Sequence, residues 1–208
     1  MPEKKKTKAK AEERITEEIK ETPKQPPYKV LFLASECVPF VKTGGLADVI
    51  GALPKELKRQ GVDVRVMIPL YSAIGPKYRE QMTRICEFYV QLGWRSQYCG
   101  ILTMEYQGVP VYFIDNEYYF GRGYIYGQSN SDEGFAFFSK AALEAMPRIG
   151  FFPDVLHAHD WQAAMSIALL RMQYGKSPDY RRVRTVYTIH NLKYQGVFNW
   201  PFMDELLS

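Results

Sequence analysis

Short apolar runs alternate with amphipathic segments along residues 28–208. Runs rich in Val, Ile, Leu and Phe have the length of strands that are buried on both faces, and they predict strands at 30–34, 64–68, 154–157 and 184–189. Apolar residues recur at helical spacing and predict helices at 46–59, 133–146 and 161–174. Because strands and helices alternate, the sequence predicts an α/β fold with a doubly wound, mostly parallel sheet.

Two further segments complete this expected sheet. Residues 99–106 and 109–114 flank a Gln-Gly pair and predict a hairpin or two neighbouring strands. Residues 115–131 are dense in Gly, Tyr and Asn and predict a loop. After the strand at 184–189 only a brief apolar run at 202–207 remains, whereas doubly wound sheets normally continue, so we expect the sheet to be incomplete.

Composition narrows the class of protein. The 208 residues are 46% hydrophobic and 24% charged, which is typical of a folded domain rather than a disordered chain. No run approaches the roughly 18–20 apolar residues of a membrane span, and no secretory apolar region follows the start. The three cysteines are too few and too scattered for a disulfide framework, so we expect a reduced, cytoplasmic protein without membrane contact.

The net charge of +4 belongs mainly to the N-terminus. Residues 1–29 carry nine Lys and Arg against six Asp and Glu, whereas the remainder carries eighteen against seventeen. Residues 1–27 have only two large apolar side chains, Ile15 and Ile19, and predict a charged flexible extension. We expect no nucleic-acid partner, because the basic excess does not lie on the folded body.

The first candidate site follows the first predicted strand. Ligands of open α/β sheets bind beyond the carboxyl ends of the strands, and there the sequence reads Lys42-Thr43-Gly44-Gly45 before a helix. Free N–H groups at a helix start and a nearby lysine favour an anion such as a diphosphate. An ordinary strand-to-helix turn with a solvated lysine remains the alternative. The segment matches neither the dinucleotide-binding glycine pattern nor the P-loop.

A second candidate follows the strand at 154–157. His157, His159 and Asp160 include metal-ligand side chains, but we expect the two histidines on opposite faces of the strand, and no other His or Cys cluster lies nearby. The sequence therefore predicts no metal site. Asp160 is expected to cap the helix that begins at Trp161, and the indole either walls a pocket or fills the core.

Polar and aromatic residues in two later loops suit a polyhydroxylated ligand. His190 and Asn191 follow the last strand and offer directed hydrogen bonds, although a lone histidine can also be structural. The loop at 118–127 combines tyrosines with Arg122; sugars stack on such rings and anions pair with arginine. A loop that packs on its own side chains is the alternative.

Taken in order, three segments carry a resemblance to a known family. Residues 42–49, 157–161 and 190–196 resemble the N-terminal part of bacterial glycogen synthases and plant starch synthases, over residues 29 to about 199. The resemblance implies a GT-B glycosyltransferase, with two Rossmann-like domains facing a cleft. It implies transfer of glucose from ADP-glucose to the non-reducing end of an α-1,4-glucan with retention, without metal or cofactor.

The resemblance also implies roles for individual residues. It gives catalytic roles to Asp48 and His190. Tyr124 competes with Tyr126 for one aromatic position. The implied substrate-binding residues are Lys42, Thr43, Gly44, Gly45, Tyr126, Trp161 and Asn191.

The chain departs from the family pattern in its length. Residues 28–208 would be a truncated N-terminal catalytic domain, and the carboxylate and Arg/Lys pair of the second domain have no counterpart here. We therefore expect ADP-glucose, glucan and a missing C-terminal domain as partners, and little or no transferase activity from this chain alone. A non-catalytic glucan-binding module and a related nucleotide-sugar glucosyltransferase remain as alternatives.

Overall fold

The computed structural model describes residues 27–127 and 131–197. Nearly all of the predicted extension at 1–27 and the apolar run at 202–207 lie outside these residues. The strands are β1 (Lys29–Leu33), β2 (Asp63–Pro69), β3 (Thr83–Leu92), β4 (Arg95–Tyr106), β5 (Val109–Asp115), β6 (Val155–His159) and β7 (Arg184–Thr188). The helices are α2 (Gly45–Arg59), α3 (Pro76–Arg79), α4 (Glu117–Phe120), α5 (Ser131–Arg148), α6 (Trp161–Met172) and α7 (Pro178–Arg181).

The strands form one seven-stranded sheet in the order β3-β4-β5-β2-β1-β6-β7. Five adjacent strands run parallel to one another, in the order β5, β2, β1, β6 and β7. Strand β4 pairs antiparallel with β3 on one side and with β5 on the other. The predicted α/β class and mostly parallel sheet are confirmed. The hairpin predicted around Gln107-Gly108 is confirmed as β4 and β5, and both turn residues have positive φ.

Four elements were not predicted from the sequence: strand β3 and the single-turn helices α3, α4 and α7. Strand β3 was not predicted; its residues alternate between exposed and buried only from Phe88 to Leu92, and its first half is largely exposed. The predicted loop at 115–131 contains the single-turn helix α4. Asn116 caps this helix by accepting a hydrogen bond from the Tyr119 amide at 2.9 Å, and the rings of Tyr119 and Phe120 are buried.

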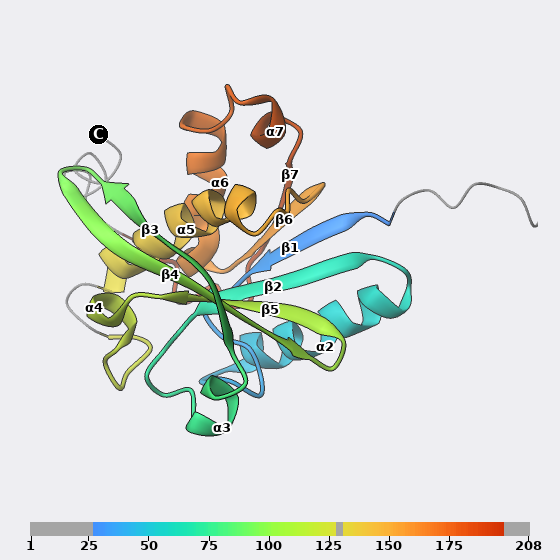
Figure 1. The fold of residues 1–208 in the computed structure, drawn as a ribbon, viewed down its shortest axis with the longest axis vertical. Helices are drawn as coiled ribbons and strands as arrows, with labels where there is room; N and C mark the ends of the chain where they lie inside the picture. Colours follow the sequence, from blue (N-terminus) through green and yellow to red (C-terminus); the bar gives the residue numbers. More distant parts are fainter. Residues whose placement is uncertain (1–26, 128–130, 198–208) are drawn as a thin grey trace, which may run out of the picture.

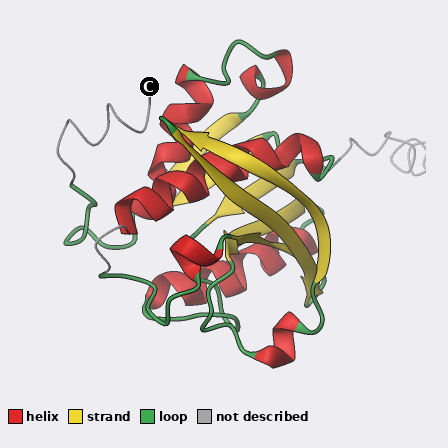
Figure 2. Cartoon of the chain, turned by 60° about the vertical axis from the view of Figure 1, so that its left-hand side comes forward, coloured by secondary structure: helices red, strands yellow, loops and turns green. Residues whose placement is uncertain are grey.

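Helices cover both faces of the sheet. The chain passes from β1 to β2 on one side and later returns to the other side of β1 with β6. Right-handed crossovers then place α2 on one face and the α5–α6 pair on the other (Figure 1). The ribbon of β3 and β4 bends across α5 (Figure 2). The strand order therefore reverses between β1 and β6, where open α/β sheets bind their ligands.

The core lies on both faces of the central strands. Leu31, Phe32 and Leu33 of β1 are fully buried, as expected for a strand between two helical layers. Strand β7 is at one edge of the described sheet, and Val186 and Tyr187 on it are each about two-fifths exposed. None of the helices in the described ranges is long and apolar enough to cross a membrane.

Candidate active site

A buried carboxylate organises the loop that follows β1. Glu36 is only 3% exposed, and it accepts hydrogen bonds from the Thr43 amide, from Thr43 Oγ1 at 2.7 Å and from the Gly44 amide at 3.1 Å. The expected anion cradle at residues 42–45 is thus partly filled by an internal anion. Gly44 occupies the N-cap position of α2 without a side-chain cap, so only the amides from Gly45 onward remain for a ligand.

Tyr126 joins this buried cluster from a distant part of the chain. Its hydroxyl lies 2.5 Å from Glu36 Oε1 and 2.8 Å from Ser35 Oγ, and burial together with the Glu36 carboxylate raises its pKa. Tyr124, the competing position, is 77% exposed. The fully buried Tyr71 hydroxyl has no hydrogen-bond partner among the described residues, and burial raises its pKa.

Lys42 and Asp48 form an ion pair at the mouth of this loop. The Lys42 Nζ lies 2.7 Å from both carboxylate oxygens of Asp48, and both side chains are about half exposed. An exposed pair of this kind contributes little to stability. An incoming anion would therefore compete with Asp48 for Lys42 at small cost.

Asp160 lies where the carboxyl ends of β6 and β7 meet. It takes the N-cap position of α6, but its side chain makes no cap hydrogen bond, so the predicted capping bond is wrong. Its Oδ1 instead accepts the backbone N–H of His190 at 2.6 Å. The backbone of Asp160 has φ 57° and ψ 177°, a strained conformation that is otherwise nearly restricted to glycine and that clusters at functional sites.

The three histidines form a stack beside Asp160. The ring centroids of His157 and His159 are 4.0 Å apart, so the expectation of opposite faces is wrong: residues two apart in a strand share a face. His159 is fully buried, and its Nδ1 lies 2.9 Å from Nε2 of His190. Within the described ranges, no group of three or more His, Cys, Asp or Glu could hold a metal ion.

Burial of His159 should make stability depend on pH. Desolvation and the two neighbouring histidines lower the pKa of His159 to about 2, so the unfolded chain binds a proton below pH 6.5 that the folded chain does not. The free energy of unfolding should therefore fall by up to about 1.4 kcal/mol per pH unit as the pH drops below 6.5. Urea unfolding at pH 7 and pH 5 measures this slope. His159→Asn should flatten it, and an equal slope in both proteins would contradict this origin.

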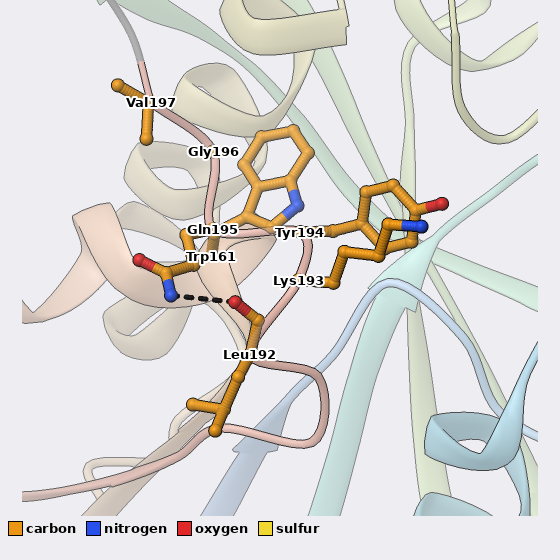
Figure 3. A pocket seen from close by; sticks show the side chains of 7 residues that line it. All are labelled: Trp161, Leu192, Lys193, Tyr194, Gln195, Gly196 and Val197. Carbon is orange, nitrogen blue, oxygen red and sulfur yellow. Dashed lines mark hydrogen bonds between the residues drawn. The ribbon is translucent and has the colours of Figure 1, made fainter.

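Trp161 connects the two halves of the site. Its indole packs edge-on against Phe135 at 5.2 Å, and Phe135 lies 6.1 Å from the Tyr126 ring. Trp161 and residues 192–197 line an open pocket of about 510 Å³. Figure 3 shows the indole beside Gly196, with the Lys193 and Tyr194 side chains together on one side of the pocket. Gln195 donates to the Leu192 carbonyl at 2.7 Å and holds the loop in its turn (Figure 3).

The other predicted positions have local partners. Asn191 Oδ1 accepts the Lys193 amide at 2.9 Å, and its side chain is exposed. Arg122 lies 5.4 Å from the centre of the Tyr118 ring, whereas the Tyr119 and Phe120 rings belong to the core. The loop at 118–127 thus divides between packing and the site, to which it contributes Tyr126.

The sequence did not indicate site roles for Glu36 or His159, and for Asp160 it predicted the N-cap position but not the hydrogen bond to the His190 amide. Glu36 lies three residues after the end of the buried strand β1, and this position was the available signal. The partners that give Glu36 its role stand up to 90 residues away in the sequence. The partner of Asp160 stands 30 residues away.

Comparisons with known proteins match most of the chain. The family profile of the starch synthase catalytic domain matches residues 29–208. The chain is 55% identical to a glycogen synthase of Desulforamulus reducens over 180 residues, covering 86% of this chain and 38% of that protein. It is 58% identical to a glycogen synthase of Bacillus cereus over 179 residues, with the same coverage.

A solved structure has the same fold. The catalytic domain of starch synthase IV from Arabidopsis thaliana, bound to ADP and acarbose, superposes with a TM-score of 0.80 at 29% identity. The match covers 86% of this chain and 37% of that one. The chain therefore spans little more than a third of the length of the proteins it matches. With a profile match over nearly all of the described residues, the chain belongs to the starch synthase catalytic domain family.

Proposed function

We propose that residues 28–208 are a truncated N-terminal catalytic domain of an enzyme that transfers glucose from ADP-glucose to the non-reducing end of an α-1,4-glucan, with retention. The observation that carries the proposal is the 52–58% identity to glycogen synthases over the whole described body. The motif residues lie together beyond the carboxyl ends of the parallel strands, which supports the proposal because α/β sheets bind their ligands there.

The donor would bind at the loop between β1 and α2. Lys42 would leave Asp48 for the diphosphate, and the uncapped amides at the start of α2 would add hydrogen bonds and the favourable helix dipole. Thr43, Gly44 and Gly45 would shape this loop, which Glu36 and Tyr126 hold from below. Once Lys42 had left it, the Asp48 carboxylate would face the cleft.

The glucan and the transferred glucose would occupy the region between His190 and Trp161. The open pocket beside the indole presents flat aromatic faces, and sugars stack on such faces. The site loop that holds His190 and Asn191 is anchored by Asp160. In this proposal His190 contacts the transferred glucose directly, whereas Asn191 shapes the turn that follows it.

The chain would need a second domain for turnover. It spans 37–38% of the length of the matched proteins. We propose that a C-terminal GT-B domain completes the cleft, that the protein acts in the cytoplasm, and that this chain alone has little or no activity. The test is transfer of labelled glucose from ADP-glucose into glycogen by the purified chain. We expect sedimentation with glycogen without transfer. A folded chain that neither binds glycogen nor transfers glucose would contradict the proposal.

Gly196→Ala should weaken glucan binding. An added Cβ would lie 2.5 Å from the Trp161 indole, and φ is +61°, so the pocket loop would have to move. The measurement uses a chimera in which residues 29–208 replace the matching segment of the Desulforamulus reducens glycogen synthase. We expect a rise of about tenfold or more in KM for glucan, since displaced positioning groups have large effects.

Gly123→Ala is the matched control. An added Cβ at Gly123 meets no atom within 4 Å, and its φ is ordinary. If Gly196→Ala and Gly123→Ala had the same KM for glucan, the pocket beside Trp161 would not be the acceptor site.

A further inference from the structure

The histidine stack contains a buried nitrogen whose hydrogen-bonding state can be deduced. Nε2 of His159 is buried and has no hydrogen-bond partner among the described residues, whereas Nδ1 of the same ring lies 2.9 Å from Nε2 of His190. Phe32 stacks on the His159 ring at 5.1 Å with an interplanar angle of 17°, and His157 stacks at 4.0 Å. These two rings cover the faces of the imidazole, and Nε2 at its edge is buried.

Burial keeps His159 neutral, because its pKa is lowered to about 2. A neutral imidazole carries one N–H and one bare nitrogen. If the proton were on Nε2, a buried N–H would have no acceptor. If it is on Nδ1, the N–H donates to His190 and only a lone pair is unpaired. Orphaned buried N–H groups are the rarer defect, so the second arrangement is favoured.

We propose that His159 is a positioning residue that fixes His190 in the tautomer with its proton on Nδ1. His190 Nε2 accepts from His159, so Nδ1 is the ring's only N–H. Within the described ranges, His190 makes two hydrogen bonds: its Nε2 accepts from His159, and its backbone N–H donates to Asp160. Its Nδ1 is therefore available to a ligand. His190 is partly exposed, so this N–H can meet an acceptor oxygen from outside the core.

Surrounding polar groups do not compete for the contact between His159 and His190. His157 directs its Nε2 to Thr188 Oγ1 at 2.8 Å, on the neighbouring strand β7. The Asp160 carboxylate is bound to the His190 backbone rather than to its ring. The tautomer follows from the described residues alone; only its use toward a sugar ligand rests on the proposed function.

The test is ¹⁵N NMR of the imidazole rings in the purified 208-residue chain at pH 7.5. The chain has three histidines, so the ring signals can be assigned by single substitutions. We expect a pyridine-type signal for Nε2 of His190 and a pyrrole-type signal for its Nδ1. The reverse pattern, or averaged signals that show rapid exchange between tautomers, would overturn the proposal. The experiment needs no activity, so it can fail or succeed independently of the glucosyltransferase assignment.

Two substitutions separate a positioning role from a structural one. His159→Leu removes the donor, and we expect the Nε2 signal of His190 to shift away from the pyridine type. His159→Asn retains an N–H near the position of Nδ1, and we expect the wild-type signals to return. The role would be contradicted if the Nε2 signal of His190 were unchanged in folded His159→Leu. It would also be contradicted if His159→Asn gave the same His190 signals as His159→Leu. If His159→Leu does not fold, the wild-type spectrum and His159→Asn decide.

Discussion

Asp160→Ala should lower kcat of the chimera about 10²-fold, the typical effect when a positioning contact near the reacting centre is lost. The carboxylate accepts the His190 amide at 2.6 Å, and this contact joins the carboxyl end of β6 to the loop after β7. The strained backbone of Asp160 aims the side chain away from its own helix and toward that loop. Without the acceptor, His190 would lose the fixed position that the proposed function places beside the transferred glucose.

Asp154→Ala is the matched control for this variant. Asp154 also accepts a backbone N–H, from Lys29 at 2.8 Å, but it stands at the opposite end of β6. Asp154→Ala should therefore lose stability, because a backbone N–H loses its acceptor, but it should keep the kcat of the unsubstituted chimera. Asp160→Asn retains an acceptor oxygen and should lie between wild type and Asp160→Ala. Equal kcat values for Asp154→Ala and Asp160→Ala would contradict the positioning role.

Glu36→Ala should reduce the free energy of unfolding by about 3 kcal/mol, because several hydrogen bonds to one buried charged group disappear together. The donors left behind are the amides of Thr43 and Gly44 and the hydroxyls of Thr43 and Tyr126. For a domain of this size the expected decrease in Tm is about 6–12 °C. Thermal unfolding followed by circular dichroism measures it.

Two further variants isolate the contribution of the Glu36 carboxylate. Glu80→Ala removes an exposed glutamate whose side chain makes no hydrogen bond or ion pair in the described part of the chain, and it should leave Tm unchanged. Glu36→Gln retains one acceptor and should recover about half of the lost stability. A Tm for Glu36→Ala equal to that of Glu80→Ala would show that the loop is held in some other way.

Much of the fold could be predicted because it rests on local apolar runs. Residues 30–34 and 64–68 are nearly all apolar, since parallel strands between two helical layers are buried on both faces. Strand β3 was missed because the alternation that indicates a half-buried strand is confined to residues 88–92, whereas Thr83, Arg84 and Glu87 in its first half are exposed and polar. Helix α4 has four residues, which is too short to show a helical period.

The structure brings the predicted segments together beyond the carboxyl ends of the strands, but the contacts between them were not predicted. The rule that ligands bind beyond the carboxyl ends of strands identified the segments that contain Lys42, Trp161 and His190. This rule places segments beyond the carboxyl ends of the strands, but it does not predict the hydrogen-bond partner of each side chain. The contacts of Glu36 with Tyr126, and of Asp160 with His190, connect segments that are distant in sequence, so only the folded chain shows them.

The central claim is that this chain supplies the N-terminal half-site of an ADP-glucose glucosyltransferase. The most direct measurement is transfer of labelled glucose from ADP-glucose into glycogen by the chimera, with Lys42→Ala as its matched variant. We expect transfer at a rate comparable to that of the parent synthase, with a marked loss in Lys42→Ala, whose only described ionic partner is Asp48. A folded chimera that transfers no glucose, or one that is unaffected by Lys42→Ala, would contradict the claim.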